Sequence, residues 1–287
     1  MTMRIVSRSY LKELERFVEE AEYPSHCIHC EGIEDVEEPK HHPSYEITSA
    51  CNLKCVFCYS YSALKAGKAP KPGYYGDLNP KAITISQYGE PLIVGHEKLS
   101  CIISELRKRF KARIDLQTNG TLLKEEVDAD IVMISLDASN RESYARITGV
   151  DMFENVLKAM DIVAASKSIG VLRTIYLPGI NDTELQQIAE IGYERGMDEF
   201  MLQPCSIHPG IEGRLLRAGY DMEKDTLYDY LDAAYRCVNV RIPGCLLKNI
   251  RRMMEVMDFE DVVFMRRNQV SAEPPEIRRE WRFVIEC

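Results

Sequence analysis

From Tyr45 onward, short apolar runs alternate with amphipathic segments, and this alternation constrains the fold more than any other feature of the chain. Strands are expected at residues 45–48, 82–86, 113–117, 131–136, 171–177, 200–203 and 238–242. Helices are expected at residues 98–110, 153–166, 182–195 and 224–235, and outside this series at 9–22 and 246–257. Strands that alternate with helices of this length predict right-handed βαβ units and a parallel sheet.

The composition limits the classes of protein to which the chain can belong. Its 287 residues, 45% of them hydrophobic, can form one large α/β domain, alone or with a small appendage. A net charge of −9 gives no electrostatic reason to bind bulk nucleic acid or an anionic membrane. No apolar run reaches membrane-spanning length, and the N-terminus carries no leader signature. We therefore expect a cytoplasmic protein, where clustered cysteines bind metal more often than they form disulfides.

Three cysteines follow the first expected strand with the spacing C-x3-C-x2-C: Cys51, Cys55 and Cys58. Three thiolates on one short loop can bind three corners of an iron–sulfur cube and leave the fourth iron open. A closed structural metal site would use four protein ligands, whereas an open position usually serves chemistry. The triad therefore predicts a catalytic [4Fe–4S] cluster.

This spacing resembles the radical S-adenosylmethionine (radical SAM) superfamily, which carries it on the loop after its first barrel strand. In that family the fourth iron holds the amino and carboxylate groups of S-adenosylmethionine. Gly89 and Glu90 end the second expected strand and resemble the family's Gly-Gly-Glu-Pro element, with Tyr88 in place of its first glycine. The resemblance implies that Gly89 and Glu90 hold the methionine amino group. Taken alone, these residues would indicate an ordinary strand-ending turn.

Polar side chains also follow the later strands in the family's order. Asn119 resembles the family's Thr-Asn-Gly element, and Ser135 and Asp137 end the fourth expected strand. The resemblance implies that they bond the ribose or the methionine head, although each can also be a turn or capping residue. Arg173 interrupts the apolar fifth strand and needs an anionic partner, either a ligand carboxylate or a neighbouring acid. Arg146 is a rival for the same role.

The same resemblance implies a fold and a reaction. The family uses an open (β/α)6 partial TIM barrel, here expected at residues 44–208, with extensions at 1–43 and 209–287. Phe57 lies where the family packs an aromatic ring beside the adenine; its alternative role is a hydrophobic plug for the loop. The reduced cluster passes an electron to the sulfonium, and the resulting 5′-deoxyadenosyl radical takes a hydrogen atom from the substrate.

The remaining cysteines leave a second metal site open. Cys27 and Cys30 have the two-residue spacing of zinc and iron–sulfur loops. They are either unliganded thiols or part of a site completed by distant cysteines. The candidates for completing it are Cys205, Cys237 and Cys245. Cys101 lies among apolar residues and is expected in the core, and Cys287 has no evident role.

Our main hypothesis is a radical SAM enzyme whose substrate can be a peptide or protein. The alternatives are a radical SAM step in cofactor or modified-nucleoside biosynthesis, and a non-catalytic iron–sulfur or zinc protein. Polar groups at successive strand ends disfavour the non-catalytic alternative, and the pI of about 5.3 disfavours whole tRNA as substrate. We expect a peptide, protein or small-molecule substrate and a low-potential electron donor such as ferredoxin or flavodoxin. No membrane or nucleic-acid partner is expected.

Overall fold

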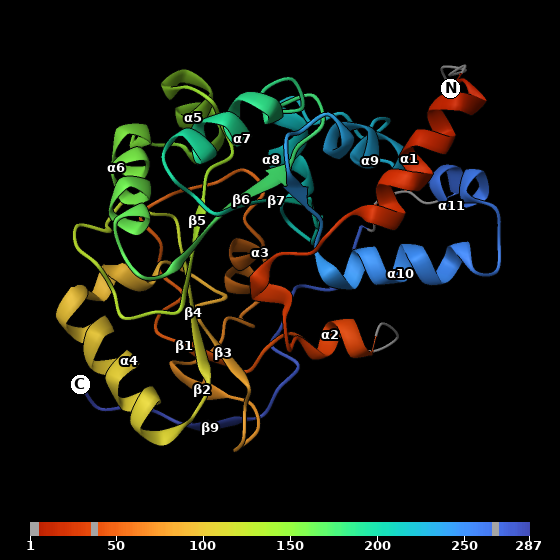
Figure 1. Cartoon of the computed structure of the whole chain (residues 1–287). Helices are drawn as coiled ribbons and strands as arrows, with labels where there is room; N and C mark the ends of the chain where they lie inside the picture. The colour runs from red at the N-terminus through yellow and green to blue at the C-terminus, as the bar shows by residue number, and fades with distance from the viewer. Residues whose placement is uncertain (1–5, 36–39, 266–269) are drawn as a thin grey trace.

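The computed structural model describes residues 6–35, 40–265 and 270–287, in which strands and helices alternate from β1 onward (Figure 1). The strands are β1 (Ser44–Glu46), β2 (Gly73–Tyr75), β3 (Ala82–Ile85), β4 (Arg113–Thr118), β5 (Ile131–Ser135), β6 (Ile169–Tyr176), β7 (Glu199–Pro204), β8 (Val240–Arg241) and β9 (Trp281–Phe283). The α-helices are α1 (Arg8–Glu20), α2 (Glu31–Glu34), α3 (Tyr59–Lys65), α4 (His96–Arg109), α5 (Arg141–Thr148), α6 (Phe153–Ala164), α7 (Leu185–Glu194), α8 (Glu212–Arg217), α9 (Leu227–Tyr235), α10 (Gly244–Met254) and α11 (Phe259–Met265). None of these helices is long and apolar enough to cross a membrane. The first five residues of the N-terminal segment lie outside the described residues.

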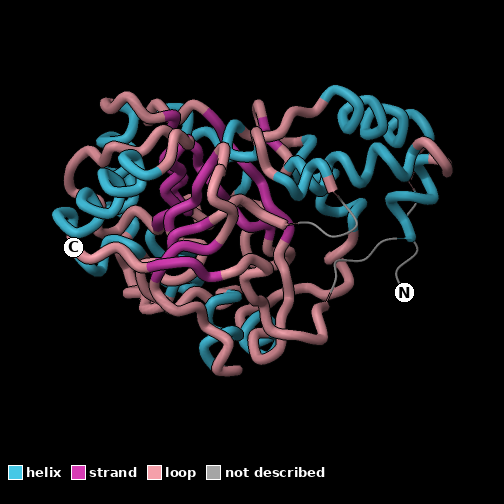
Figure 2. Tube along the Cα trace, turned by 90° about the horizontal axis from the view of Figure 1, so that it is seen from below, coloured by secondary structure: helices cyan, strands magenta, loops and turns pink. Residues whose placement is uncertain are grey.

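The described strands form one open sheet in the order β8-β7-β6-β5-β4-β3-β1-β2-β9. From β1 and β3 through β8 every pairing is parallel, whereas β2 and β9 pair antiparallel at one edge. Seen from below, the strands form the centre of the molecule and helices lie around them (Figure 2). The outermost strands, β8 and β9, do not pair with each other, so the sheet stays open. This confirms the expected α/β fold, an open partial barrel.

Every expected strand and helix is present, with bounds within about three residues of the expectation. The short strands β2 and β9 were not expected, because three residues cannot show an alternating pattern. Helices α2, α3, α5, α8 and α11 were not expected either. The ends of α5 are nevertheless marked in the sequence: Asn140 accepts the Glu142 and Ser143 amides, and Gly149 follows with a left-handed φ of 75°.

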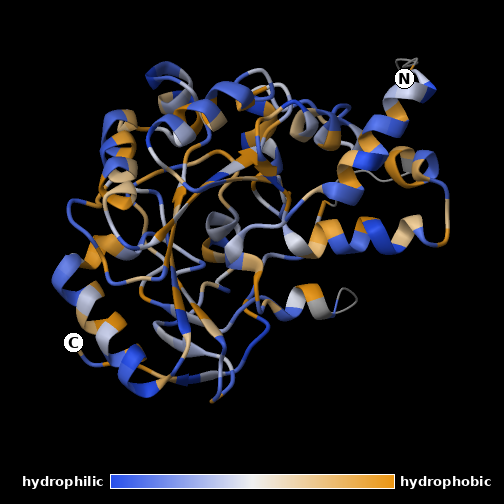
Figure 3. Ribbon diagram, in the orientation of Figure 1, coloured by the Kyte–Doolittle hydropathy of each residue, from blue (hydrophilic) through white to orange (hydrophobic). Residues whose placement is uncertain are grey.

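The outer face of the sheet is covered by helices whose apolar stripes face it (Figure 3). On α4 this stripe repeats at intervals of three and four residues, and each member is at most 2% exposed: Leu99, Ile102, Ile103 and Leu106. Alternation along β5 sends Val132 and Ile134 into this main core. The alternating residues Ile131 and Met133 point to the opposite face and join a separate small cluster with Val171 and Met201.

The segment before β1 lies against the amino ends of the strands. The Ser25 amide and hydroxyl both donate to Glu199 at the start of β7, at 2.8 and 2.6 Å. His26 Nδ1 lies 2.7 Å from Asp115 in β4. These contacts dock the N-terminal segment on the sheet, and the division of the chain at 43/44 and 208/209 stays a prediction.

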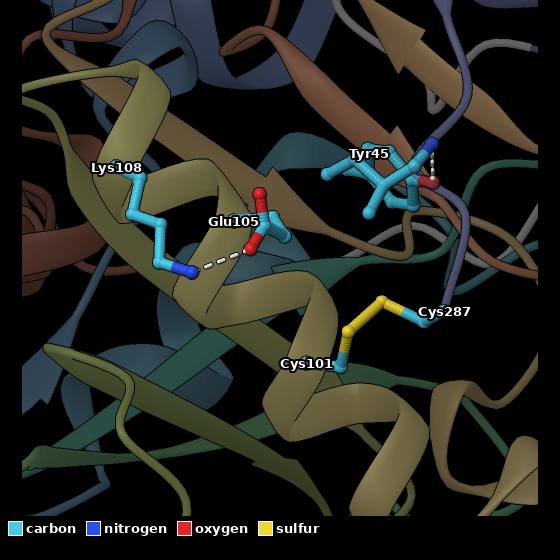
Figure 4. Close-up of a disulfide and its surroundings, with 6 residues drawn as sticks. Tyr45, Cys101, Glu105, Lys108 and Cys287 are labelled. Atoms are coloured by element: carbon cyan, nitrogen blue, oxygen red, sulfur yellow. Dashed lines mark hydrogen bonds and ion pairs between the residues drawn. A yellow bond between two sulfur atoms is a disulfide. The ribbon is translucent and has the colours of Figure 1, made fainter.

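The C-terminus is tied to α4 by a disulfide between Cys101 and Cys287 (Figure 4). The expectation that Cys101 is a simple core residue was wrong: its stripe neighbours are buried, but its own side chain is only half-buried and faces the C-terminal segment. The same segment is held by Tyr45, whose hydroxyl accepts the Ile285 amide at 2.8 Å. The disulfide therefore fastens the β9 edge of the sheet to its helical layer.

Candidate active site

The cysteine triad lies on the loop between β1 and α3, at the carboxyl end of β1. The end of α5 fixes this loop: the Lys54 amide donates to Thr148 O at 2.8 Å, and the Val56 amide donates to Ile147 O at 3.0 Å. Cys58 caps the amino end of α3, and its amide donates to Cys55 O at 3.2 Å. The loop is thus held by backbone hydrogen bonds at several points, which leaves its thiols free to bind a ligand.

The three thiols share one short loop and act on one another. Burial raises the pKa of Cys51 and of Cys55, and neighbouring thiols of the triad raise it further. Three thiolates on such a loop can bind three irons of a cluster and leave the fourth iron open.

Gly89 presses directly against the strand end that precedes the triad. Its φ of 70° lies in the left-handed region, and a Cβ there would lie 2.2 Å from Thr48 O and 2.7 Å from Ala50 O. The Glu90 amide donates to Ala50 O at 2.8 Å. The glycine expected from the motif is therefore required by the close approach of two backbone segments.

The Glu90 carboxylate points into the protein and braces the neighbouring strand end. It is 1% exposed and accepts the Thr118 hydroxyl at 2.8 Å, the Asn119 amide at 2.7 Å and the Leu92 amide at 3.1 Å. Burial raises the pKa of Glu90 to about 7, against the opposing effect of these donors. The expected contact of Glu90 with the methionine amino group stays a prediction, and the geometry gives its side chain a positioning role.

Asn119 directly follows β4 and connects the end of this strand to the cysteine loop. Its Nδ2 lies 3.7 Å from Cys51 Sγ and donates to Asn52 Oδ1 at 2.9 Å. Its Oδ1 accepts the Thr121 hydroxyl and amide at 2.6 and 3.0 Å. The side chain is therefore fixed beside a triad thiol, which is where a ligand of the open iron would lie.

Tyr88 replaces the motif's first glycine without blocking the loop. It is 3% exposed, and its ring packs edge-on against Tyr59 with centroids 5.2 Å apart. Glu46 of β1 holds the turn by accepting the Gln87 and Tyr88 amides at 3.2 and 3.0 Å. Sequence reasoning missed Glu46, although an acid in an apolar strand was a usable signal. Burial raises its pKa to about 7.

Arg173 lies on the inner face of the sheet and reaches across two neighbouring strands. Its guanidinium donates to Gln117 Oε1 at 3.0 Å and to Ser135 Oγ at 3.1 Å, and its Nε is buried without a partner. Among the described ion pairs, Arg173 has no acidic partner. Asp137 nevertheless lies close enough for Arg173 to oppose the rise in the pKa of this acid, so a neighbouring acid and a ligand carboxylate both stay open as partners of the guanidinium.

The other expected residues lie nearby but make different contacts. Asp137 is 4% exposed and accepts the Ile175 amide at 2.7 Å, and burial raises its pKa to about 7. Phe57 is half-buried and packs against the main core, as its alternative role as a plug requires. Arg146, the rival of Arg173, donates to Ile180 O at 3.1 Å. Cys205 is buried in the core at the end of β7.

Arg214 of α8 holds the cysteine loop from the C-terminal extension, and sequence reasoning missed it. Its guanidinium donates to Lys54 O at 2.8 Å and to Cys55 O at 3.0 Å. It also lies over the Tyr61 ring, 4.4 Å from the centroid. No motif marks an arginine 159 residues from its partner, so only the fold reveals this contact.

The family model described as the radical SAM superfamily matches residues 45–191, just over half of the chain. The chain belongs to the radical SAM superfamily. Members of this superfamily use a [4Fe–4S] cluster and S-adenosylmethionine, and Cys51, Cys55 and Cys58 are three thiols on one loop within the matched residues. The expected cofactors are therefore confirmed at the level of the family.

Similar proteins include an uncharacterized protein of Methanocaldococcus jannaschii, 37% identical over 98% of this chain and 99% of its own length. A GTP 3′,8-cyclase of Chlorobaculum tepidum is 33% identical over 66% of this chain. The chain spans only 60% of the length of that cyclase. The solved structure of TYW1 with a lysine-pyruvate adduct bound is 19% identical, with a TM-score of 0.46 over 80% of this chain and 89% of that one.

Proposed function

We propose that this radical SAM enzyme acts on a small anionic molecule in cofactor or modified-nucleoside biosynthesis. This is the alternative that the sequence left open, and we prefer it to a peptide or protein substrate. The observation that carries it is Arg173, a cation on the inner face held only by neutral side chains. A half-buried cation whose described hydrogen bonds all go to neutral side chains can bind an anionic group of a ligand, such as a carboxylate or phosphate.

The relatives support the same choice. The 33% identical protein of Chlorobaculum tepidum is named for a reaction on GTP, a small molecule with three phosphates. Because this chain spans 60% of that protein, we carry over only the substrate class, a nucleotide or similar anion, and not the reaction. As electron donor we propose a low-potential protein such as ferredoxin or flavodoxin.

The chain's own residues have distinct proposed roles at this site. Cys51, Cys55 and Cys58 hold the cluster, which with S-adenosylmethionine supplies a carbon radical that removes a hydrogen atom from the substrate. The Asn119 side chain fixes the loop beside the open position, and Glu90 fixes Asn119 through its amide. These two contacts set where a ligand of the open iron can lie.

Four further side chains have proposed roles around the ligand. Phe57, Ser135 and Asp137 are proposed to line the S-adenosylmethionine side of the site, and Arg173 is proposed to bind the anion. All four lie on the triad loop or in the carboxyl halves of β5 and β6 and the loop that follows β5. Ligands of parallel α/β sheets bind at this end of the strands.

The test is 5′-deoxyadenosine formation by the anaerobically reconstituted, reduced protein. Nucleoside triphosphates, other phosphorylated small molecules and a peptide mixture would each be added with S-adenosylmethionine. We expect a nucleotide to stimulate formation and the peptide mixture not to; the reverse result would reject the proposal. The Arg173→Gln variant then separates two anions: a raised KM for the nucleotide assigns Arg173 to the substrate, and a raised KM for S-adenosylmethionine assigns it to that carboxylate.

A further inference from the structure

Lysine and arginine side chains gather around the cysteine loop, in a chain whose net charge is −9. Lys54 lies on the loop itself and is exposed, and Lys65 ends α3, the helix that follows the loop. Arg214 and Arg217 belong to α8, where their spacing of three residues makes the two side chains neighbours. We call these four residues the basic surface.

Contacts between the loop, α3 and α8 bring these cations together. Arg214 donates to Lys54 O at 2.8 Å and lies over the Tyr61 ring of α3, 4.4 Å from its centroid. The Lys65 side chain packs against Gly210, shortly before α8: a Cβ at this glycine would lie 3.5 Å from Lys65 Cδ and 3.8 Å from its Nζ. Residues from distant parts of the sequence thus share one surface beside the loop.

Little opposing charge neutralises the basic surface. Within the described ranges, none of the ion pairs involves one of its four members. Lys68, in the loop after α3, is different, because it pairs with Glu276 at 3.5 Å. Residues 51–65 and α8 contain one acid, Glu212. This region is therefore positively charged in an acidic protein and attracts anionic surfaces.

Apolar side chains are exposed beside these cations. Tyr61 and Leu64 of α3 are 40% and 49% exposed, and Leu216 of α8 is 50% exposed. Exposed apolar side chains with a charged rim are typical of protein-binding surfaces. Nucleic acids are bound mainly through their phosphates, to which leucine side chains contribute nothing. The basic surface thus fits an acidic protein better than a nucleic acid.

The basic surface lies directly against the residues that hold the catalytic cluster. Arg214 donates to Cys55 O at 3.0 Å, and Cys58 caps the amino end of α3. The remaining cysteine of the triad, Cys51, is exposed. Because electron transfer slows steeply with distance, an electron donor has to dock close to the cluster. The cysteine loop and the helices beside it meet this condition.

We propose that the basic surface is the docking site of an acidic, low-potential electron-donor protein. The inference rests on the proposed function, which requires such a donor, and it adds where on this chain the donor binds. One electron passes from the reduced donor to the oxidised cluster, and no bond forms or breaks in this step. Complementary charge speeds the encounter, and a small interface lets the oxidised donor leave again.

The test compares two charge-reversal variants of the reconstituted protein. Lys65→Glu/Arg217→Glu changes the basic surface, and Lys98→Glu/Lys158→Glu changes the net charge equally at exposed positions of α4 and α6. Binding of oxidised flavodoxin and of oxidised ferredoxin would be measured by calorimetry at about 0.05 M and about 0.5 M salt. In low salt the first variant should raise the Kd at least about tenfold and the control should not, and the difference should shrink in high salt. No binding of either donor to the wild type, or equal Kd values for the two variants, would overturn the proposal.

Two reductants separate this proposal from the proposed function. With dithionite, which needs no docking site, both variants should form 5′-deoxyadenosine at the wild-type rate. With a subsaturating concentration of the reduced donor that binds, the Lys65→Glu/Arg217→Glu variant should be slower by about the same tenfold factor. No product from the wild type with dithionite would reject the proposed function, and the binding measurement would still decide the docking site. Equal donor-dependent rates for the variant and the wild type would reject the docking site alone.

A competition experiment tests the nucleic-acid alternative. Bulk transfer RNA would be added to the complex of the wild type with the donor that binds. We expect the donor to stay bound. Displacement of the donor, together with transfer RNA binding that Lys65→Glu/Arg217→Glu abolishes, would assign the surface to nucleic acid and overturn the proposal.

Discussion

The two ends of the parallel strands carry cysteine sets with opposite origins. At the carboxyl ends, Cys51, Cys55 and Cys58 come from eight consecutive residues, and Cys51 is exposed. At the amino ends, Cys27 and Cys30 are buried and meet Cys245 from the far end of the chain. The first set, called the exposed set after Cys51, is open to a ligand, whereas the second, buried set lies where the N-terminal segment meets the start of α10.

The buried acids at the two ends of the strands have pKa values that are shifted in opposite directions. At the carboxyl ends burial raises the pKa of Glu46, Glu90 and Asp137 to about 7 each, and at Asp137 it outweighs the opposing effect of Arg173. At the amino end, burial would also raise the pKa of Asp115, but His26 and Arg113 outweigh it and lower that pKa. The candidate active site is thus the end where burial shifts the pKa values of several acids, which is typical of functional sites.

The largest expected effect comes from removing one cysteine of the triad. Cys55→Ala should lower 5′-deoxyadenosine formation by at least about 100-fold and remove about four irons, because the cluster loses a ligand. Cys237→Ala, which changes a buried thiol that donates to Ala233 O, should change neither. Iron counts and product assays on both variants test this. Wild-type cleavage by Cys55→Ala would refute the assignment of the triad.

Breaking the buried set should give the complementary result. Cys27→Ala/Cys30→Ala should lower the midpoint of thermal unfolding by several degrees, because both side chains are buried and Cys27 accepts the Gly244 amide. The catalytic cluster should remain, with the specific rate of S-adenosylmethionine cleavage reduced by less than about tenfold. Calorimetry and single-turnover assays measure the two quantities. Loss of cleavage with an unchanged midpoint would place this set in the catalytic machinery instead.

The disulfide Cys101–Cys287 should stabilise the protein without affecting the catalytic cluster. Cys287→Ser should cost about 2–4 kcal/mol of unfolding free energy under non-reducing conditions, because the bridge restricts a long unfolded loop. Under dithiothreitol the variant and the wild type should have equal stability. Denaturant titrations with and without reductant measure this, and a difference that persists in reductant would show that the serine itself, not the bridge, is responsible.

The sequence predicted the sheet because short, mostly apolar runs alternate with amphipathic segments, and it predicted the triad because its ligands lie within eight residues. Cys245 could not be assigned to Cys27 and Cys30, since nothing local marks a partner more than 200 residues away. Arg214 was missed for the same reason. Glu46 is different: it is a charge inside an apolar strand, the same signal that drew attention to Arg173.

The contact of Arg214 with the cysteine loop should have a moderate effect. Arg214→Ala removes two hydrogen bonds to Lys54 O and Cys55 O, which are worth about 1 kcal/mol each in such settings, and should lower cleavage roughly fivefold to tenfold. Exposed Arg217→Ala on the same helix is the matched control. Cleavage rates at fixed iron content test this; equal rates for both variants would show that α5 alone holds the loop.

The smallest effects are in the pH dependence of stability, and they should have opposite signs at the two ends. Glu46 has a raised pKa, so its contribution is full below pH 4.5 and is lost as the pH rises toward 7. Asp115 has a lowered pKa, so its contribution is full above pH 3.8 and is lost as the pH falls. Relative to wild type, Glu46→Gln should therefore gain stability between pH 4.5 and 7, and Asp115→Asn should recover stability only in acid. Urea denaturation between pH 3 and 8 measures both slopes. If the stability of Glu46→Gln depends on pH in the same way as that of the wild type, Glu46 stays ionised in the folded protein. The Gln87 and Tyr88 amides would then outweigh its burial.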